Sequence, residues 1–384
     1  MNCIEYPFDE VVTLFDKQRV PLSSMDRAKR QGKYRYYGAQ GIIDYIDDYI
    51  FDGEYILLAE DGENLKSNKQ NLAQLVDGKF WVNNHAHILR TKRICRLRYF
   101  YYWINSKNMT EYVTGSAQPK LSQSSLKKMV IPLPSLEVQD KILGAIIPID
   151  EKIKENARIN KNLEEQAKAI LTHLLEVSED STLARLGDYL YIKGRIGWKG
   201  LKKSEYLNHS DYRIINGESL TTSGIDWDKT GYISKVRYDE SPEIMLQIGD
   251  ILLSKDGTIG KIGYVNQLDA PTSVASGIFV IRNTKPDIIS TPFIYYLLKS
   301  SLFNSFVAGR TEGSVIPHLY QKDFKEFEFP LPSKKEMSTF DDLIGPQFEK
   351  FFANQVENEY LAKLRGTLLP KLMSGEIDVS ALEF

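Results

Sequence analysis

The feature that most constrains this chain is an internal repeat at an offset of 198 residues. Shifting the sequence by that amount places Gly115 to Leu175 over Gly313 to Met373 without a gap. The tripeptide Pro-Leu-Pro occupies 132–134 in the first copy and 330–332 in the second. Matches at one fixed offset over so long a segment indicate that the chain contains two copies of one module, each ending in a long helical pattern.

The regions that precede the two helical patterns read as short strands and helices separated by turns. Strand patterns at 55–59 and 250–254 are each closed by an Asp-Gly turn, which indicates that the two globular regions share a frame. The expected fold class is α+β, with two mixed α/β domains separated by two long antiparallel coiled-coil helices. The predicted segments are 1–135 and 181–333 for the globular domains, and 136–180 and 334–384 for the helices and C-terminal tail.

Both helical patterns have an apolar seam with alternating steps of four and three residues, which is typical of a coiled coil. The seam starts at Ile142 in the first copy and at Phe340 in the second, and it carries two asparagines in each: Asn156, Asn160, Asn354 and Asn358. A buried asparagine costs stability but fixes the register of a helix pair. An antiparallel pair with aligned midpoints would place Asn156 against Asn358 and Asn160 against Asn354. The alternative is an amphipathic helix packed on its own domain.

Two prolines interrupt these seams at equivalent places, Pro148 and Pro346. Because proline lacks a backbone N–H and clashes with the preceding turn, we expect a kink or a fresh helix start at each.

Composition excludes several classes of protein. Apolar residues make up 42% and charged residues 26% of the chain, as in ordinary globular proteins. No apolar run approaches the roughly 18–20 residues that a membrane span needs, and the first residues do not resemble a secretion signal. Two cysteines are too few for a disulfide framework or a zinc site. We therefore expect a cytoplasmic protein without a membrane association.

The sequence does not contain the usual catalytic or cofactor-binding motifs. No phosphate-binding loop, dinucleotide-binding fingerprint or methyltransferase motif is present. His85 and His87 would share one strand face, where two imidazoles can hold a metal, but a third ligand is not apparent and packing is the favoured interpretation. The glycine-rich segment 257–263 leads into a strand pattern, so we expect a surface hairpin that could offer backbone N–H groups and Lys261 to a phosphate.

Clusters of cations and aromatic residues favour contact with nucleic acid, because guanidinium groups suit guanine edges and phosphates and lysines suit phosphates. For any single residue the alternative is a solvated surface charge. Ser116 and Ser314 belong to the repeated Gly-Ser motif, which is either a phosphate contact or a turn at the end of the domain. The candidate DNA contacts are Arg30, Lys33, Arg35, Tyr36, Arg93, Ser116, Lys199, Lys202, Lys203, Lys255, Thr258, Lys261 and Ser314.

Several segments resemble the specificity (S) subunits of type I restriction–modification enzymes, and the resemblance covers essentially the whole chain. These segments are 36–55, 80–89, 257–263, the two Pro-Leu-Pro motifs before the long helices, and 368–379. The resemblance implies two target recognition domains, each reading one half of a split DNA site, and two helices that pair as a spacer and dock methyltransferase (M) subunits.

The resemblance also implies how the chemistry is divided among partners. An S subunit is not an enzyme and holds no cofactor. S-adenosylmethionine would be bound by the M subunits, of which we expect two, and restriction (R) subunits would supply translocation and cleavage. The partners are therefore double-stranded DNA, M subunits and R subunits. The alternatives from other classes are a solitary scaffold or regulator of the same fold that binds only protein, and a nuclease whose site is not recognisable in the sequence.

Overall fold

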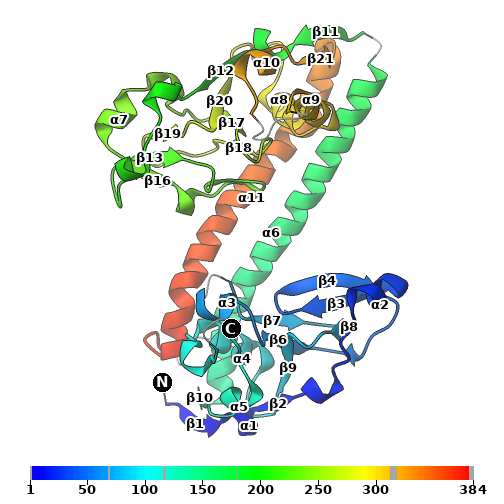
Figure 1. Ribbon diagram of the computed structural model, residues 1–384, viewed down its shortest axis with the longest axis vertical. Coiled ribbons are helices and arrows are strands. Elements are labelled where there is room, and N and C mark those ends of the chain that lie inside the picture. Colours follow the sequence, from blue (N-terminus) through cyan, green and yellow to red (C-terminus); the bar gives the residue numbers. More distant parts are fainter. Residues whose placement is uncertain (1, 68–69, 116–117, 179, 312–317, 380–384) are drawn as a thin grey trace. The chain divides into compact units, whose positions relative to one another are not determined.

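The computed structural model describes residues 2–67, 70–115, 118–178, 180–311 and 318–379 (Figure 1). The chain divides into two compact units. Unit 1 consists of residues 1–154 and 357–384, and unit 2 consists of residues 155–356. Each unit therefore contains one globular region and half of each long helix, whereas the sequence-based division separates the helices from the globular regions.

Unit 1 contains two four-stranded sheets, with strand orders β2-β9-β6-β7 and β4-β3-β8-β5, and a two-stranded ribbon of β1 and β10. Its strands are β1 (Ile4–Pro7), β2 (Val12–Leu14), β3 (Gln31–Gly38), β4 (Gly41–Ile46), β5 (Phe51–Asp52), β6 (Tyr55–Ala59), β7 (Ala73–Val76), β8 (Lys79–Val82), β9 (Ala86–Thr91) and β10 (Val130–Leu133). Its short helices are α1 (Phe8–Val11), α2 (Ser24–Lys29), α3 (Asn64–Ser67), α4 (Leu97–Ser106) and α5 (Gln123–Leu126), with 3-10 turns at Asp16–Gln18 and Thr110–Tyr112.

Unit 2 has a four-stranded sheet ordered β12-β20-β17-β18, a three-stranded sheet ordered β16-β13-β19, and the ribbons β11-β21 and β14-β15. Its strands are β11 (Thr182–Arg185), β12 (Leu190–Gly194), β13 (Tyr212–Ile215), β14 (Leu220–Thr221), β15 (Gly224–Ile225), β16 (Gly231–Ile233), β17 (Ile251–Ser254), β18 (Ile262–Tyr264), β19 (Thr272–Val274), β20 (Ile278–Asn283) and β21 (Glu328–Leu331). Its short helices are α7 (Lys235–Asp239), α8 (Thr291–Leu298), α9 (Ser301–Thr311) and α10 (Gln321–Lys325).

The two units share the pairing of their central strands, although the smaller sheet has four strands in unit 1 and three in unit 2. The central strands β6 and β9 pair antiparallel in unit 1, as β17 and β20 do in unit 2. In the smaller sheet, β3 pairs antiparallel with β4 and parallel with β8, and β13 pairs in the same way with β16 and β19. The strand patterns at 55–59 and 250–254 are confirmed as β6 and β17, and so is the α+β class of two related mixed domains.

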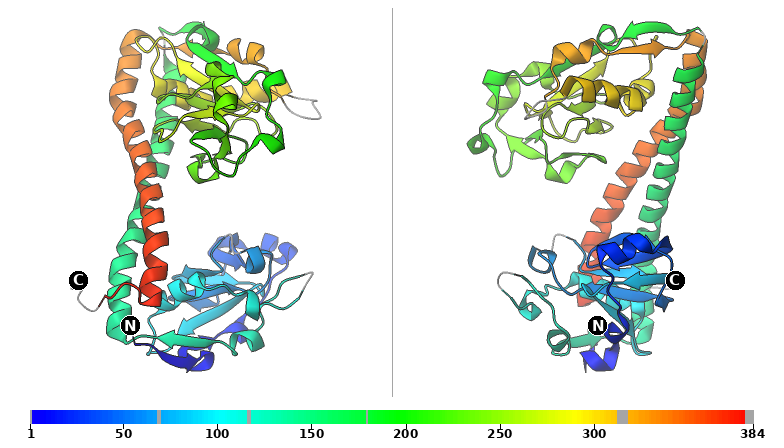
Figure 2. Two further views of the ribbon diagram at one scale, coloured as in Figure 1. Left: turned by 90° about the vertical axis from the view of Figure 1, so that its left-hand side faces the viewer. Right: turned by 45° about the vertical axis from the view of Figure 1, so that its right-hand side comes forward.

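The core of each unit includes part of the long helices α6 (Leu136–Val177) and α11 (Lys334–Ser374). In unit 1 the start of α6 contributes Ile142 and Ile146 to the apolar cluster that also contains Leu372 of α11. In unit 2 the start of α11 contributes Phe340 and Ile344, and the end of α6 contributes its own apolar side chains. Figure 2 shows the two helices running beside each other within each unit.

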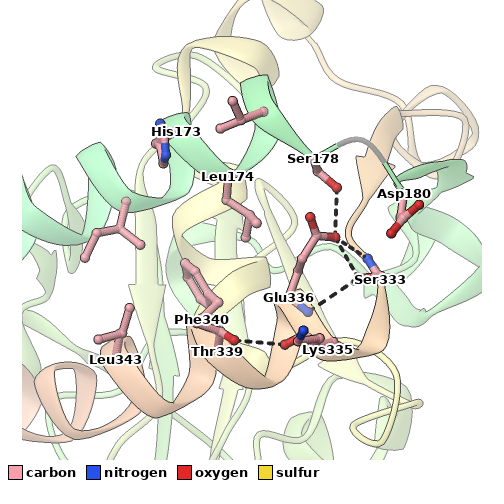
Figure 3. A pocket seen from close by; sticks show the side chains of 12 residues that line it. His173, Leu174, Ser178, Asp180, Ser333, Lys335, Glu336, Thr339, Phe340 and Leu343 are labelled. Carbon is pink, nitrogen blue, oxygen red and sulfur yellow. Dashed lines mark hydrogen bonds between the residues drawn. The ribbon is translucent and has the colours of Figure 1, made fainter.

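Of the two alternatives expected at the prolines, the fresh helix start is wrong, and the kink stays a prediction. Pro148 lies inside α6 and Pro346 lies inside α11, and both helices continue through them. A proline inside a helix removes one intrahelical hydrogen bond and clashes with the preceding turn, and the apolar contacts that each helix makes before and after its proline offset this cost. The helices begin earlier, after the Pro-Leu-Pro motifs. At α11 the Ser333 backbone N–H donates to Glu336 Oε2 at 2.9 Å, which caps the first turn (Figure 3).

Candidate nucleic-acid interface

Strands β3 and β8 and the segment between β4 and β5 bring two tyrosines and two lysines together in unit 1. The ring centres of Tyr34 and Tyr49 lie 5.1 Å apart. Lys33 Nζ lies 5.3 Å from the ring centre of Tyr34, and Lys79 Nζ lies 4.5 Å from that of Tyr49. A hydrogen bond with Tyr49 raises the pKa of Lys79. This lysine–tyrosine cluster combines positive charge with aromatic surface, the two features that bind phosphates and stack on bases.

Tyr49 and Lys79 were missed by reasoning from the sequence. Lys79 lies far from Lys33 along the chain and reaches it because β3 pairs with β8 in parallel, with Arg35 opposite Phe80. Tyr49 lies between β4, the other neighbour of β3, and β5. The only available signal was the strand pattern at 80–82 next to a lysine, which does not reveal which strand is its neighbour.

The arginines of the same segment are held by contacts within unit 1. Arg30 pairs with Asp47 at 2.9 Å, and its guanidinium lies 4.9 Å from the ring centre of Trp81. Arg35 donates from Nη2 to the Asp77 carbonyl and lies 5.7 Å from the ring centre of Tyr37. Part of the charge predicted for this surface is therefore neutralised by neighbouring carboxylates, and Lys33 is the more exposed cation.

Tyr36 does not lie on the surface. Its side chain is fully buried, and its hydroxyl oxygen accepts a hydrogen bond from the Leu22 backbone N–H at 2.9 Å. The prediction that Tyr36 contacts DNA is therefore replaced by a role in the core. Neighbouring side chains of a strand point to opposite faces of its sheet, and this explains why Tyr36 of β3 points into the core.

The basic segment after β9 divides into an anchoring part and an exposed part. Arg96 binds both carboxylate oxygens of Asp140 on α6, at 2.8 and 2.7 Å, and this contact raises its pKa. Arg98 lies 3.6 Å from Glu151, also on α6. Arg93 is exposed in the turn before α4 and remains available to a partner. Arg96 and Arg98 thus join the globular region of unit 1 to its part of α6.

In unit 2 the candidate contacts Lys199, Lys202 and Lys203 lie on the loop after β12. Lys199 donates from Nζ to the Glu240 carbonyl at 2.5 Å. Lys202 and Lys203 are exposed. Arg237 on α7 donates to the carbonyls of Lys199 and Gly200 at 3.0 and 3.1 Å, so it fixes the backbone that leads to the two exposed lysines.

A buried arginine lies at the base of this loop. Arg195 is 3% exposed and donates to the Val274 carbonyl at 3.2 Å and to the hydroxyls of Ser241 and Ser273 at 3.3 Å. Burial lowers its pKa, and the nearby Arg237 acts in the same direction. Arg195 joins the end of β12 to β19 and therefore fixes the position of the start of the loop. Nothing in the sequence distinguishes this arginine from the exposed cations around it.

The glycine-rich segment forms the predicted hairpin between β17 and β18, which pair antiparallel. Lys255 is mostly buried, with Nζ 5.3 Å from the ring centre of Phe279. Thr258 is exposed at the tip, and its carbonyl accepts from Ser254 Oγ at 2.7 Å. Lys261 Nζ donates to the Gly217 carbonyl at 2.9 Å. The hairpin thus brings Thr258 to the surface, while both lysines make contacts within unit 2. Ser116 and Ser314 lie outside the described residues.

The asparagines of the helix pair make hydrogen bonds across the seam. In unit 2, Asn354 Nδ2 donates to Asn160 Oδ1 at 2.8 Å, and Asn160 Nδ2 donates to the Phe351 carbonyl at 2.9 Å. In unit 1, Asn358 Nδ2 donates to the Ile153 carbonyl at 3.4 Å. The contact between Asn160 and Asn354 is the one that an antiparallel pair with aligned midpoints predicts. Asn156 is fully buried, and its pairing with Asn358 stays a prediction.

The two histidines have separate environments. His85 precedes β9 and contacts Asp61 Oδ2 at 2.7 Å. His87 is buried, with Nδ1 2.6 Å from Asp16 Oδ2 and Nε2 2.7 Å from the Leu121 carbonyl. Burial favours the neutral form of Asp16, but the hydrogen bond and charge of His87 outweigh it, so the pKa of Asp16 is lowered.

His87, Asp16 and Glu60 offer three possible metal ligands within 4.8 Å of one another. Two cations already pair with these carboxylates, because Arg19 lies 2.7 Å from Glu60 and 3.5 Å from Asp16, and Lys120 Nζ lies 3.2 Å from Glu60. The cluster is therefore a largely buried ion network that holds the 3-10 turn Asp16–Gln18 against β9.

In the part of the chain that the structure describes, no helix is both long and apolar enough to cross a membrane.

Comparison with known proteins gives one consistent family. A model of the type I restriction modification DNA specificity domain matches residues 5–165 and again 179–365. A Haemophilus influenzae protein, provisionally named a type I restriction enzyme specificity subunit, is 28% identical over 350 residues, which is 86% of this chain and 83% of that protein. The MjaVIII specificity subunit of Methanocaldococcus jannaschii is 22% identical, covering 100% of this chain and 96% of its own.

The fold agrees with that family. The crystal structure of the S subunit from M. genitalium superimposes with a TM-score of 0.66 at 19% identity, covering 97% of this chain and 96% of that one. The resemblance noted in the sequence is thus confirmed by a family model that matches two successive segments. The chain therefore belongs to the type I restriction modification DNA specificity family, whose members are the non-catalytic specificity subunits of these systems.

Proposed function

We propose that the chain selects the DNA target of a type I restriction–modification complex, with each globular region reading one half of a split site. The observation that carries this proposal is the repetition of one topology with two different cationic surfaces. The smaller sheets share their strand pairing, β4-β3-β8 and β16-β13-β19, while the side chains around them differ. Two similar folds with different surface chemistry suit the recognition of two unlike half-sites.

In unit 1 the lysine–tyrosine cluster is the proposed contact surface, with Arg30, Arg35 and Arg93 as further candidates. The lysines would bind phosphates, since an ammonium is a point charge, and the tyrosine rings would pack against sugars or bases. In unit 2 the proposed contacts are Lys202, Lys203 and Thr258, with Lys199, Lys255 and Lys261 beside them. These lysines supply affinity, and base-specific contacts would come from side chains of the same surfaces.

The partners proposed for the chain are M subunits, two per chain, and R subunits. S-adenosylmethionine would be bound by the M subunits. The helices α6 and α11 would dock the M subunits and set the number of base pairs between the half-sites. The hydrogen bond between Asn160 and Asn354 supports this role, because it fixes the register of the pair in unit 2.

The test is methylation of genomic DNA by a complex of this chain and its M subunit, with modified adenines located by sequencing. A split target with two defined halves supports the proposal, and methylation without such a target overturns it. The variant Lys33→Ala/Lys79→Ala should weaken recognition of one half only, and Lys202→Ala/Lys203→Ala should weaken recognition of the other. Equal loss at both halves in either variant would exclude two independent readers.

The spacer role is tested by inserting one heptad into α6 and one into α11 at matched positions in the seam. Seven residues lengthen a helix by roughly 10 Å, which corresponds to about three base pairs of DNA. The target spacer should lengthen accordingly. The matched control is a heptad in α6 alone, which should disrupt pairing instead. An unchanged spacer after the double insertion would refute this role of the helices.

A further inference from the structure

The smaller sheets of the two units carry the same dipeptide at the same place in their pairing register. The dipeptide is Tyr34-Arg35 on β3 and Tyr212-Arg213 on β13. In both sheets the arginine is the first residue of its strand to pair with the parallel neighbour, which is β8 in unit 1 and β19 in unit 2. The two dipeptides therefore occupy equivalent positions, although the repeat at 198 residues does not align them.

The antiparallel neighbours of these strands also agree. The tyrosine of each dipeptide lies opposite a fully buried isoleucine, Ile46 of β4 in unit 1 and Ile233 of β16 in unit 2. The arginine of each dipeptide lies opposite a second tyrosine, Tyr45 or Tyr232. The same four residue types therefore meet across these strands in both units.

Both arginines are held by an aspartate of their own unit. Arg35 donates from Nη2 to the Asp77 carbonyl, and Arg213 Nη1 lies 3.5 Å from Asp269 Oδ2. Each aspartate lies three residues before the residue that pairs with its arginine, so the two contacts are equivalent. The arginines thus fix the strand that carries the tyrosine, and they leave the tyrosine as the group that faces solvent.

A further tyrosine meets the first one in each unit. The ring centres of Tyr212 and Tyr238 lie 5.0 Å apart, as those of Tyr34 and Tyr49 lie 5.1 Å apart. Tyr49 follows β4, and Tyr238 lies on α7, which follows the equivalent strand β16 (Figure 1). Each unit therefore displays a pair of tyrosine rings at the same part of its smaller sheet.

The interior of the smaller sheet differs between the units, whereas its tyrosine pair is the same. The register places Tyr36 and Trp81 of unit 1 at the positions of Ile214 and Ser273 in unit 2, and all four are buried. The four tyrosines of the two ring pairs are only half-buried. Packing alone would preserve the buried residues first, because these make the most contacts. Contact with a ligand common to both units accounts for the opposite pattern.

The tyrosine pair of unit 2 lies beside an exposed lysine. Lys235 stands three residues before Tyr238 on α7, so the two side chains share one side of the helix. Lys235 pairs with Asp239 in the same helix, and an exposed pair of this kind is weak enough to be exchanged for a phosphate. A hydrogen bond and the charge of Asp239 raise the pKa of Lys235, and Tyr212 acts in the same direction.

The hydroxyl groups of the pair are available as donors. Among the described residues, no hydrogen bond is made by the hydroxyl of Tyr212 or of Tyr238. Burial raises the pKa of Tyr238, so its hydroxyl keeps its proton. Tyrosine hydroxyls and lysine ammonium groups both donate to the phosphate oxygens of DNA. The three side chains therefore suit the sugar–phosphate backbone.

The charges around the two tyrosine pairs are not the same. Asp211 takes the position that Lys33 holds in unit 1. In unit 2 further positive charge comes from Lys202 and Lys203, whose loop is joined to α7 by the contacts of Arg237. The aromatic part of the surface is therefore common to both units, and the charged part is particular to each.

We propose that Tyr212, Tyr238 and Lys235 bind the sugar–phosphate backbone of the half-site that unit 2 reads, as the lysine–tyrosine cluster does for unit 1. Backbone contacts fix the position of a protein on DNA and carry no sequence information. The shared site thus positions each unit, while side chains that differ between the units select the bases. This inference rests on the proposed function and adds to it a second contact site and the division between positioning and reading.

The first test measures binding of the complex with M subunits to a DNA duplex of random sequence by fluorescence anisotropy. Tyr212→Phe/Tyr238→Phe removes both hydroxyls and keeps both rings. The affinity should fall at least about tenfold, because hydrogen bonds to charged groups are lost. The control is Tyr189→Phe, a half-buried tyrosine of the same unit with Lys285 Nζ 5.1 Å from its ring centre, which should bind as the wild type does. Unchanged affinity in the double variant, or equal loss in the control, overturns the proposal.

The second test is the dependence of the same binding on the KCl concentration. Lys235→Ala should reduce the slope of log K against log[KCl] by about 0.9, the value for one phosphate contact. Lys229→Ala is the matched control, because Lys229 is 61% exposed and pairs with Asp226, much as Lys235 is 66% exposed and pairs with Asp239. An unchanged slope in Lys235→Ala overturns the proposal.

The third test separates positioning from reading. Tyr34→Phe/Tyr49→Phe should lose affinity to the same degree as the double variant of unit 2, and neither should change the bases that define the methylated target. A target with altered bases would show that the tyrosines read sequence, and it would overturn the proposal. If the wild-type complex methylates no split target, the proposed function fails, whereas affinity for the random duplex still decides whether this site binds the backbone.

Discussion

The hydrogen bond between Asn160 and Asn354 allows a quantitative test of the helix pair. Asn354 is fully buried, and Asn160 is 8% exposed, so water cannot replace a lost partner without opening the seam. Asn354→Ala removes the donor to Asn160 Oδ1, and Asn160→Ala removes that acceptor together with the donor to the Phe351 carbonyl. Each substitution leaves a buried polar atom unsatisfied, which costs about 1–3 kcal/mol of unfolding free energy.

The double variant Asn160→Ala/Asn354→Ala should cost less than the sum of the two single variants. In it, neither side chain is left facing a missing partner, and only the Phe351 carbonyl loses its donor. For two residues in direct contact the expected coupling is about 0.5–3 kcal/mol. Replacement of both by leucine should leave the stability unchanged or raise it, since an apolar pair fits the seam, but it should relax the register.

The assay is equilibrium unfolding in urea, with the change in midpoint converted through the slope of the transition. Asn208→Ala, at an exposed position of the same unit, is the control and should change the free energy by less than about 0.5 kcal/mol. A coupling of zero within error, with both single variants destabilised, would show that the two amides act independently. The register would then depend on the apolar seam alone.

Three further predictions concern single groups. Because the pKa of Asp16 is lowered in the folded protein, the contribution of Asp16 to stability is complete above about pH 4 and is lost as the pH falls through its folded-state pKa. Asp16→Asn should therefore flatten the acid side of a curve of unfolding free energy against pH. Unchanged acid sensitivity would contradict this. Arg282→Met should destabilise unit 2 by about 3–5 kcal/mol in urea unfolding, because it removes the cation and the two hydrogen bonds, at 2.7 and 2.8 Å, that Arg282 gives the fully buried carboxylate of Asp250. A loss below 1 kcal/mol, roughly the value of a surface pair, would refute the reasoning. Gly257→Ala should lower the unfolding free energy by about 1–2 kcal/mol in thermal unfolding, because Gly257 has φ +66°, a conformation that alanine disfavours. The added Cβ would meet nothing within 4 Å, so the loss would come from the backbone alone. An unchanged stability would show that the turn adapts.

The parts of this protein that follow from local sequence were predictable. The repeat, the strand patterns, the hairpin at 257–263 and the apolar seams depend on residues close together in the chain, where the period of the pattern reports the element. The contact between Asn160 and Asn354 also followed, because a seam with known spacing fixes which residues oppose each other once the helices run antiparallel. The fresh helix start considered at the prolines was wrong because helix propensity is local, whereas apolar contacts along the helix decide whether it continues.

The candidate surface was predicted only in part. The basic segment around Lys33 was recognised from its charges, but the burial of Tyr36 depends on which face of β3 meets the core. Lys79 joins that surface through the pairing of β3 with β8, Tyr49 joins it from the segment after β4, and the buried Arg195 holds its loop through β19. These are contacts between residues far apart in sequence, so no period or motif reports them.

The sequence by itself determined that this chain is a repeated module with two helices, because that information lies in spacing along the chain. The tertiary structure decided which polar groups remain exposed and which are buried. Tyr34 and Tyr36 stand two residues apart in one strand pattern of the sequence, and only the packing of unit 1 reveals that Tyr36 is fully buried while the ring of Tyr34 lies beside that of Tyr49. Burial is a property of neighbours brought together by folding, and it becomes visible only when those neighbours are in place.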